Sequence, residues 1–233
     1  MKFKLLWLAL FVSTLLFTSC KEDTTEEVSK TYDLQGFTEI DLGDAFEIII
    51  SKGNTFEVKA FGTTRNIDEL QLKVVNNRLT AKYEPYRNAR KRTQITVQVP
   101  KLTYLRLSGA TETELRGFFS ATDSLKLSVD GASELDADME WRYLDLKVSG
   151  ASDVTLDGVT RNVKMEVSGT SRLIANNLRT ETVEANVSGV SRASVNVLKS
   201  LTGNVSGNSE LRYIGNPTTL QVELSGNSKL TKL

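Results

Sequence analysis

The sequence predicts an all-β protein: a right-handed parallel β-helix, or β-solenoid, of about seven coils with an N-terminal β-rich capping segment. The first observation is a Ser-Gly phrase that recurs at spacings of 18 to 22 residues, with its glycines at Gly109, Gly131, Gly150, Gly169, Gly189, Gly207 and Gly226. The second is the alternation of apolar and polar residues on both sides of each glycine, which is typical of strands with one buried face. A helical repeat would space its apolar residues three or four apart, so we expect strands that stack coil upon coil.

Residues 1–19 have the pattern of a lipoprotein signal peptide. Lys2 and Lys4 precede an apolar run of about 13 residues that ends at Phe17, which is too short to span a membrane as a helix. The following Thr18-Ser19-Cys20 resembles a bacterial lipobox, in which the cysteine is acylated and the preceding peptide removed. We therefore expect Cys20 to be the lipidation site, and the lipid to be the contact with the membrane.

Residues 20–30 are polar and cannot bury enough apolar surface to fold, so we expect a flexible tether. Directly after the cysteine, Lys21-Glu22-Asp23 resembles the acidic surface-export signal of lipoproteins in the Bacteroidetes. This signal predicts an outer-membrane lipoprotein exposed at the cell surface, with a periplasm-facing orientation as the alternative.

Residues 31–100 are rich in alternating segments but lack the repeat. Four segments alternate, at residues 37–42, 45–50, 55–60 and 93–99, and Asn76-Asn77 is typical of a two-residue hairpin turn. We expect an antiparallel sheet or the first irregular coils, in either case covering the open N-terminal edge of the solenoid.

Residues 101–233 form the predicted solenoid, in which each unit is a strand, a Ser-Gly corner, a second strand and a short return. Glycine suits the corner because a tight bend often needs a positive φ. The serine two residues after most of these glycines is expected to stack into a ladder, each hydroxyl donating to its neighbour. The returns are marked by apolar residues such as Val159, Leu178 and Leu198.

These motifs together resemble a known family. The lipobox, the opening Gly36-Phe37-Thr38-Glu39-Ile40, the Val-x-x-Pro-x-Leu motif from Val97 to Leu102 and the repeated Ser-Gly-Ala-Ser are similar to the putative auto-transporter adhesin head domain, also called the GIN domain. The resemblance covers about residues 34–225. It implies a secreted or surface-attached β protein and brings no catalytic residues.

Composition excludes several classes of function. The chain of 233 residues has no histidine and one cysteine, which excludes Ser-His-Asp and Cys-His catalytic pairs, cysteine-based zinc sites and an intramolecular disulfide framework. Removal of residues 1–19 takes away Lys2 and Lys4, so that 27 basic residues face 29 acidic ones, a net charge of −2. We expect no cofactor and no nucleic-acid partner.

One acidic group on the outer face is a weak candidate for a calcium site. If the coils are in register, Glu112, Glu134 and Asp153 stack about 4.8 Å apart, with Glu114 and Asp136 beside them. Such like charges repel, and a cation with oxygen ligands would compensate them. The alternatives are a solvated acidic face and, less favoured, the paired carboxylates of a polysaccharide-active β-helix enzyme.

A basic stretch follows Tyr86, with Arg87, Arg90, Lys91 and Arg92 between two predicted strands. We expect a solvated hairpin tip, and contact with an anionic polymer or lipid headgroup is the alternative. The sequence as a whole predicts a lipid-anchored, adhesin-like protein without enzymatic activity, whose ligand is a glycan or a surface protein. A structural envelope spacer is the competing role, and the ligand and oligomeric state are left open.

Overall fold

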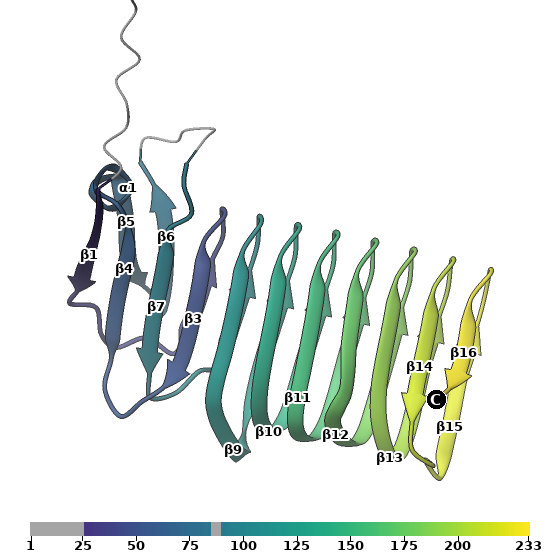
Figure 1. The fold of residues 1–233 in the computed structure, drawn as a ribbon. Helices are drawn as coiled ribbons and strands as arrows, with labels where there is room; N and C mark the ends of the chain where they lie inside the picture. Colours follow the sequence, from purple (N-terminus) through teal and green to yellow (C-terminus); the bar gives the residue numbers. More distant parts are fainter. Residues whose placement is uncertain (1–25, 85–89) are drawn as a thin grey trace, which may run out of the picture.

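The structure is a computed structural model that describes residues 26–84 and 90–233. In these residues sixteen strands share one continuous sheet, and the single helix, α1 (Thr64–Glu69), is short. The strands wind into a rod of stacked coils around one continuous apolar core (Figure 1). The predicted all-β solenoid is confirmed.

Five long strands make up most of the rod: β9 (Glu112–Val129), β10 (Glu134–Val148), β11 (Asp153–Val167), β12 (Arg172–Val187) and β13 (Arg192–Val205). They pair in parallel and in chain order. Each strand begins after one corner glycine and runs through a bend to the next corner, so the expected return between two strands is part of one bent strand.

The end of the rod is split into shorter strands: β14 (Glu210–Ile214), β15 (Thr219–Leu224) and β16 (Lys229–Lys232). Pro217 lies in the break between β14 and β15. A proline has no N–H to donate to a ladder, which explains why a continuous strand stops there.

The corner glycines stack directly upon one another. All seven have positive φ, between 70° and 82°. The amide of Ala151, the residue after Gly150, donates to the carbonyl of Gly131 one coil earlier at 2.7 Å, and the same bond recurs at every corner. A Cβ on Gly150 would lie 2.3 Å from that carbonyl oxygen. The corner therefore needs glycine for its backbone angle and also for the close approach of the neighbouring coil.

The serines after the corners are buried, but they do not form the expected hydroxyl ladder. Ser171 and Ser191 donate to the carbonyls of Gly150 and Gly169 in the preceding coil, at 3.4 and 3.3 Å. Ser133 and Ser152 instead donate to carbonyls of their own corners. Backbone carbonyls, and not the hydroxyls of neighbouring serines, accept these four hydrogen bonds.

The solenoid begins earlier in the chain than residue 101, where we expected it. Strands β2 (Glu39–Leu42) and β3 (Glu47–Lys52) already form a coil, and its corner is Asp44, with φ of 60°. The amide of Ala110 donates to the carbonyl of Asp44 at 2.6 Å, exactly as later corner amides do to glycines. Because aspartate tolerates a positive φ better than most residues, this corner lacks the glycine signature.

A later segment stacks on the N-terminal side of this first coil. Strand β2 lies between β6 (Arg78–Tyr83) and β8 (Tyr104–Leu107), and β3 lies between β7 (Gln94–Val99) and β9, all in parallel. The coil formed by β6 and β7 therefore precedes the first coil in space although it follows it in sequence. Residues 31–100 thus contain two coils as well as a cap.

The cap consists of antiparallel strands at the N-terminal end. Strand β4 (Glu57–Thr63) pairs with β7, β5 (Leu70–Val75) pairs with β6, and β1 (Glu27–Tyr32) pairs with β4. The predicted hairpin between β5 and β6 is confirmed, with positive φ at both Asn76 and Asn77. Strand β1 also begins inside residues 20–30, so the expected tether is already paired from Glu27 onward.

The corner stacking predicts different costs for two glycine substitutions. Gly169 and Gly117 both have φ of 80°, but a Cβ at Gly169 would lie 2.4 Å from the carbonyl oxygen of Gly150, whereas at Gly117 it would meet nothing closer than 3.9 Å. We expect Gly117→Ala to lose about 1–2 kcal/mol from its backbone angle alone. Gly169→Ala should lose about 2 kcal/mol more, because the backbone of the preceding coil must move. Urea unfolding of both variants measures this difference, and equal losses would contradict the stacking.

Candidate functional site

The structure places the predicted acidic residues in the expected columns. Glu112, Glu134 and Asp153 are directly in register on β9, β10 and β11. Asp136 pairs in register with Glu114 beside them. The side chains of this acidic group are exposed on the outer face of the rod.

Arginines lie against four members of this acidic group, including Glu114, which is 3.9 Å from Arg116. The other ion pairs are Arg92 with Glu112, Arg116 with Asp136 at 3.0 Å, and Arg172 with Asp153 at 3.7 Å. The hydrogen bond to Asp136 raises the pKa of the Arg116 guanidinium. Within the described residues no group of three or more Asp, Glu, His or Cys side chains is placed to hold a metal ion. The arginines supply the positive charge that the calcium hypothesis assigned to a cation.

Within the basic stretch, Arg90 departs from the expected solvated tip, whereas Lys91 and Arg92 are exposed. Arg87 lies outside the described residues. The Arg90 side chain is only 9% exposed, lies 2.7 Å from the carboxylate of Glu69, and stacks 4.0 Å from the ring centroid of Tyr83. Since Arg90 is held against the cap and Arg92 pairs with Glu112, two of the four cations are already engaged within the protein.

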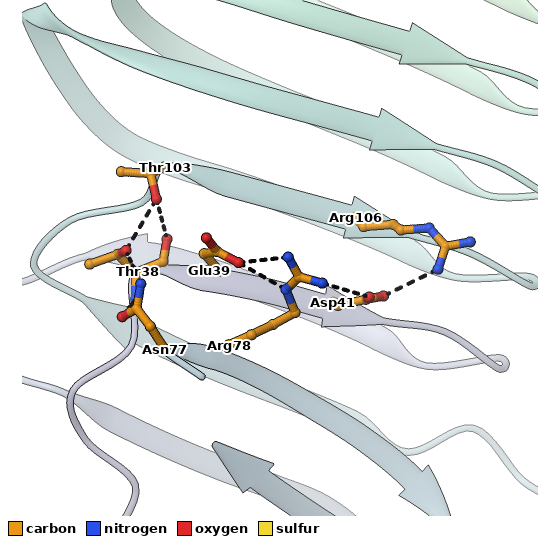
Figure 2. Close-up of polar contacts among 7 residues, drawn as sticks. All are labelled: Thr38, Glu39, Asp41, Asn77, Arg78, Thr103 and Arg106. Atoms are coloured by element: carbon orange, nitrogen blue, oxygen red, sulfur yellow. Dashed lines mark hydrogen bonds and ion pairs between the residues drawn. The ribbon is translucent and has the colours of Figure 1, made fainter. Parts of the chain in front are cut away.

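A second polar cluster joins the coils that stack out of sequence order. Figure 2 shows its members on β2 and on the neighbouring segments, namely Thr38, Glu39, Asp41, Asn77, Arg78, Thr103 and Arg106. Arg78 donates to Glu39 twice, at 2.9 and 2.7 Å, and Arg106 lies 3.7 Å from Asp41. Each guanidinium faces a carboxylate from another strand, so this cluster ties β2 to β6 and β8 and presents no unsatisfied charge.

A groove of about 330 Å³ is lined by residues at the bends of β10 to β13. These bends lie at the edge of the rod away from the glycine corners (Figure 1). The groove crosses four coils, so its long direction follows the rod. Its walls include the exposed apolar side chains of Val159 and Leu198, two of the residues that we expected to mark the returns. Leu178, the third, is buried.

Three arginines line the same groove: Arg142, Arg161 and Arg179. Arg161 lies 3.8 Å from Glu181, which also pairs with Lys199 at 2.7 Å, and the hydrogen bond from Lys199 lowers the pKa of Glu181. The side chains of Arg142 and Arg179 are exposed, and neither has an ion pair or hydrogen bond to another residue in the described part of the chain. The groove thus combines two available guanidinium groups with an apolar wall.

The sequence signal for this groove is weak. Arg142 and Arg161 are 19 residues apart and lie between residues paired in register on β10 and β11. Arg179 pairs with Val159, so the third arginine is offset from their column although its spacing of 18 residues matches the repeat. Only the apolar residues expected at the returns, of which Val159 and Leu198 are exposed, indicate that this edge differs from a solvated face.

Two findings bear on the membrane. No helix among the described residues has the length and hydropathy needed to cross a bilayer. Cys20, the predicted lipidation site, lies outside the described residues.

Comparisons with known proteins agree on the fold. A sequence profile of the family described as "putative auto-transporter adhesin, head GIN domain" matches residues 36–217. A putative adhesin from Bacteroides fragilis NCTC 9343 is similar with a TM-score of 0.81 at 20% identity, over 91% of this chain and 99% of that one. A search of curated proteins found no match.

Two solved structures from Parabacteroides distasonis ATCC 8503 are also similar. One is a putative adhesin, with a TM-score of 0.70 at 14% identity, over 91% of this chain and 98% of that one. The other is a putative lipid binding protein, with a TM-score of 0.70 at 12% identity and the same coverage, 91% and 98%. At these identities the likeness concerns the fold.

The burial of Arg90 predicts that it stabilises the cap. Arg90→Ala removes one of the two arginines that pair with the mostly buried carboxylate of Glu69, and also the stacking on Tyr83, so we expect a loss of about 2–3 kcal/mol. Lys91→Ala, at an exposed neighbour, should change stability by less than about 0.5 kcal/mol. Urea unfolding compares the two, and similar small losses would mean that Arg90 is a solvated surface residue after all.

Proposed function

The chain belongs to the putative auto-transporter adhesin head GIN domain family, and from this premise we propose that it is a lipid-anchored, non-catalytic binding protein of the cell envelope. The observation that carries the proposal is the groove at the bends of β10 to β13, with the unpaired guanidinium groups of Arg142 and Arg179. We assign the groove an extended anionic ligand, namely a glycan strand that carries carboxylates or sulfates.

The chemistry of the groove fits such a ligand. A guanidinium binds a carboxylate or sulfate through two parallel N–H donors, and it does so more strongly than neutral donors do. Val159 and Leu198 offer an apolar surface for the non-polar face of a sugar ring. Successive coils are about 4.8 Å apart, which is close to the length of one sugar unit, so a strand lying along the rod can repeat the same contact.

The acidic group on the opposite side favours binding over hydrolysis. A glycosidase needs one protonated carboxyl group as its general acid. Asp136 and Asp153 are instead engaged in ion pairs with Arg116 and Arg172. This supports a protein without enzymatic activity.

The leader supports the proposed location. A lipid at Cys20 would hold the rod at the outer membrane, and Lys21-Glu22-Asp23 favours exposure at the cell surface over a periplasm-facing orientation. The head domain would then reach outward from the anchor.

Charge reversal in the groove tests the ligand class. We expect Arg142→Glu with Arg179→Glu to weaken binding to polygalacturonate at least about tenfold, because two charge-assisted contacts become repulsive. Lys73→Glu with Arg192→Glu makes the same change in net charge at exposed sites outside the groove and should leave affinity unchanged. Biolayer interferometry measures both, with neutral dextran as the control polymer. Equal weakening by both pairs, or equal binding of dextran, would contradict the proposal.

Metabolic labelling with a fatty acid tests the anchor. The native protein should carry label and fractionate with membranes, whereas Cys20→Ser should carry none and appear in soluble fractions. Glu22→Gln with Asp23→Asn is expected to keep the label but to become resistant to protease added to intact cells, since it loses the acidic export signal. An unlabelled native protein would refute lipidation, and a protease-resistant native protein would refute surface exposure.

A further inference from the structure

The last coil of the solenoid has an open edge. Among the described residues β15 pairs only with β13, and β16 pairs only with β14. Leu224 is 50% exposed and Leu233 is 56% exposed, and Leu220 is exposed with them. The other end of the rod is covered by the antiparallel strands β1, β4 and β5, so the two ends differ in kind (Figure 1).

The backbone of this edge is set to accept another strand. The amides of Ser225, Lys229 and Leu233 point back and donate to the preceding coil. Alternate residues of a strand direct their N–H and C=O groups to opposite sides. The N–H and C=O groups of Val222 on β15 and Leu230 on β16 therefore point away from the preceding coil, along the rod. They are the unpaired backbone groups typical of an edge strand, to which another strand can bind.

We propose that this edge binds the same edge of a second copy of the protein about a two-fold axis that runs parallel to the strands. Such an axis exchanges the two halves of the last coil, so that β15 of one copy lies beside β16 of the other. Because β15 runs toward the corner and β16 runs away from it, the two strands meet antiparallel. The symmetry produces two identical ladders and closes the assembly at two copies.

The side chains select one register for this pairing. When Val222 stands opposite Leu230 of the second copy, the outward-facing backbone groups of both residues meet and apolar side chains face each other. Glu223 then stands opposite Lys229 of the second copy, on the outer face. Neither Glu223 nor Lys229 has an ion pair within the described residues, and both are exposed. The direction of the free backbone groups, the contact between apolar side chains and the pairing of opposite charges therefore all favour the register in which Val222 stands opposite Leu230.

The arrangement has a consequence for adhesion, which rests on the proposed function. Strand β1, the element nearest the predicted lipid at Cys20, lies at the end of the sheet opposite to β16. Two copies joined through their last coils therefore carry their anchors at opposite ends of one longer rod. If each anchor lies in a membrane, the pair joins two facing membranes, and the binding partner at the tip is the protein itself.

Charge complementation tests the pairing. Glu223→Lys places lysine at both positions of the pair, and Lys229→Glu places glutamate at both. Each variant alone should dimerise at least about tenfold more weakly than the native chain, because like charges then oppose each other in both ladders. An equimolar mixture of the two variants should recover native affinity to within about threefold, since every lysine again faces a glutamate.

Sedimentation equilibrium of the full chain in density-matched detergent measures these affinities. A monomeric native chain, a mixture that stays as weak as its parts, or association that continues beyond two copies would each overturn the proposal. The groove variant Arg142→Glu with Arg179→Glu should dimerise normally, which separates failure of this pairing from failure of the glycan proposal.

Vesicles test the pairing between facing membranes. Vesicles that carry Glu223→Lys and vesicles that carry Lys229→Glu should aggregate only when the two kinds are mixed, and aggregation of either kind alone would contradict this pairing.

Discussion

Each corner from Gly109 to Gly226 brings the main chain of its coil into contact with the main chain of the corner before it. The amide after the corner residue donates to a carbonyl one coil away, at 2.6 to 2.8 Å from Asp44 to Gly226. That distance leaves no space for a Cβ at the seven glycines and holds them at positive φ. The corner fixes the rise and register of the coils, and the register in turn determines which side chains share a column on the outer face. The acidic group, the second polar cluster around Arg78 and the groove at the bends all depend on this register.

The backbone of the terminal coil is covered at one end of the rod and exposed at the other. At the N-terminal end the chain reverses direction, and antiparallel strands together with a buried Arg90–Glu69 pair cover the first coils. At the other end the last coil keeps the parallel winding and exposes both its backbone and its apolar residues. Because one end is covered and the other is open, the two ends of the rod differ, as the proposed anchor at one end and the proposed contacts along the side and tip require.

Much of the fold could be predicted from the sequence, because glycine at the corners and alternation along the strands are local requirements. The same logic placed Glu112, Glu134 and Asp153 in one column and the hairpin at Asn76-Asn77. The corner at Asp44 was missed because another residue takes the positive φ. The stacking of residues 78–99 before residues 39–52 depends on contacts between segments that are distant in sequence, and no local sequence pattern indicates it. The inward turn of Arg90 and the groove around Arg142 and Arg179 likewise depend on neighbours that are distant in sequence.

Native-state hydrogen exchange of the corner amides tests the account most directly. The amides of Ala132, Ala151, Thr170, Val190 and Asn208 each bond to the glycine carbonyl one coil earlier. If the corners hold the coils together, these amides exchange as slowly as those of the buried strands on either side, although they lie in turns and their residues are exposed. Exchange at the rate of solvated loops would mean that the corners do not hold the coils together, and the columns built on them would lose their basis.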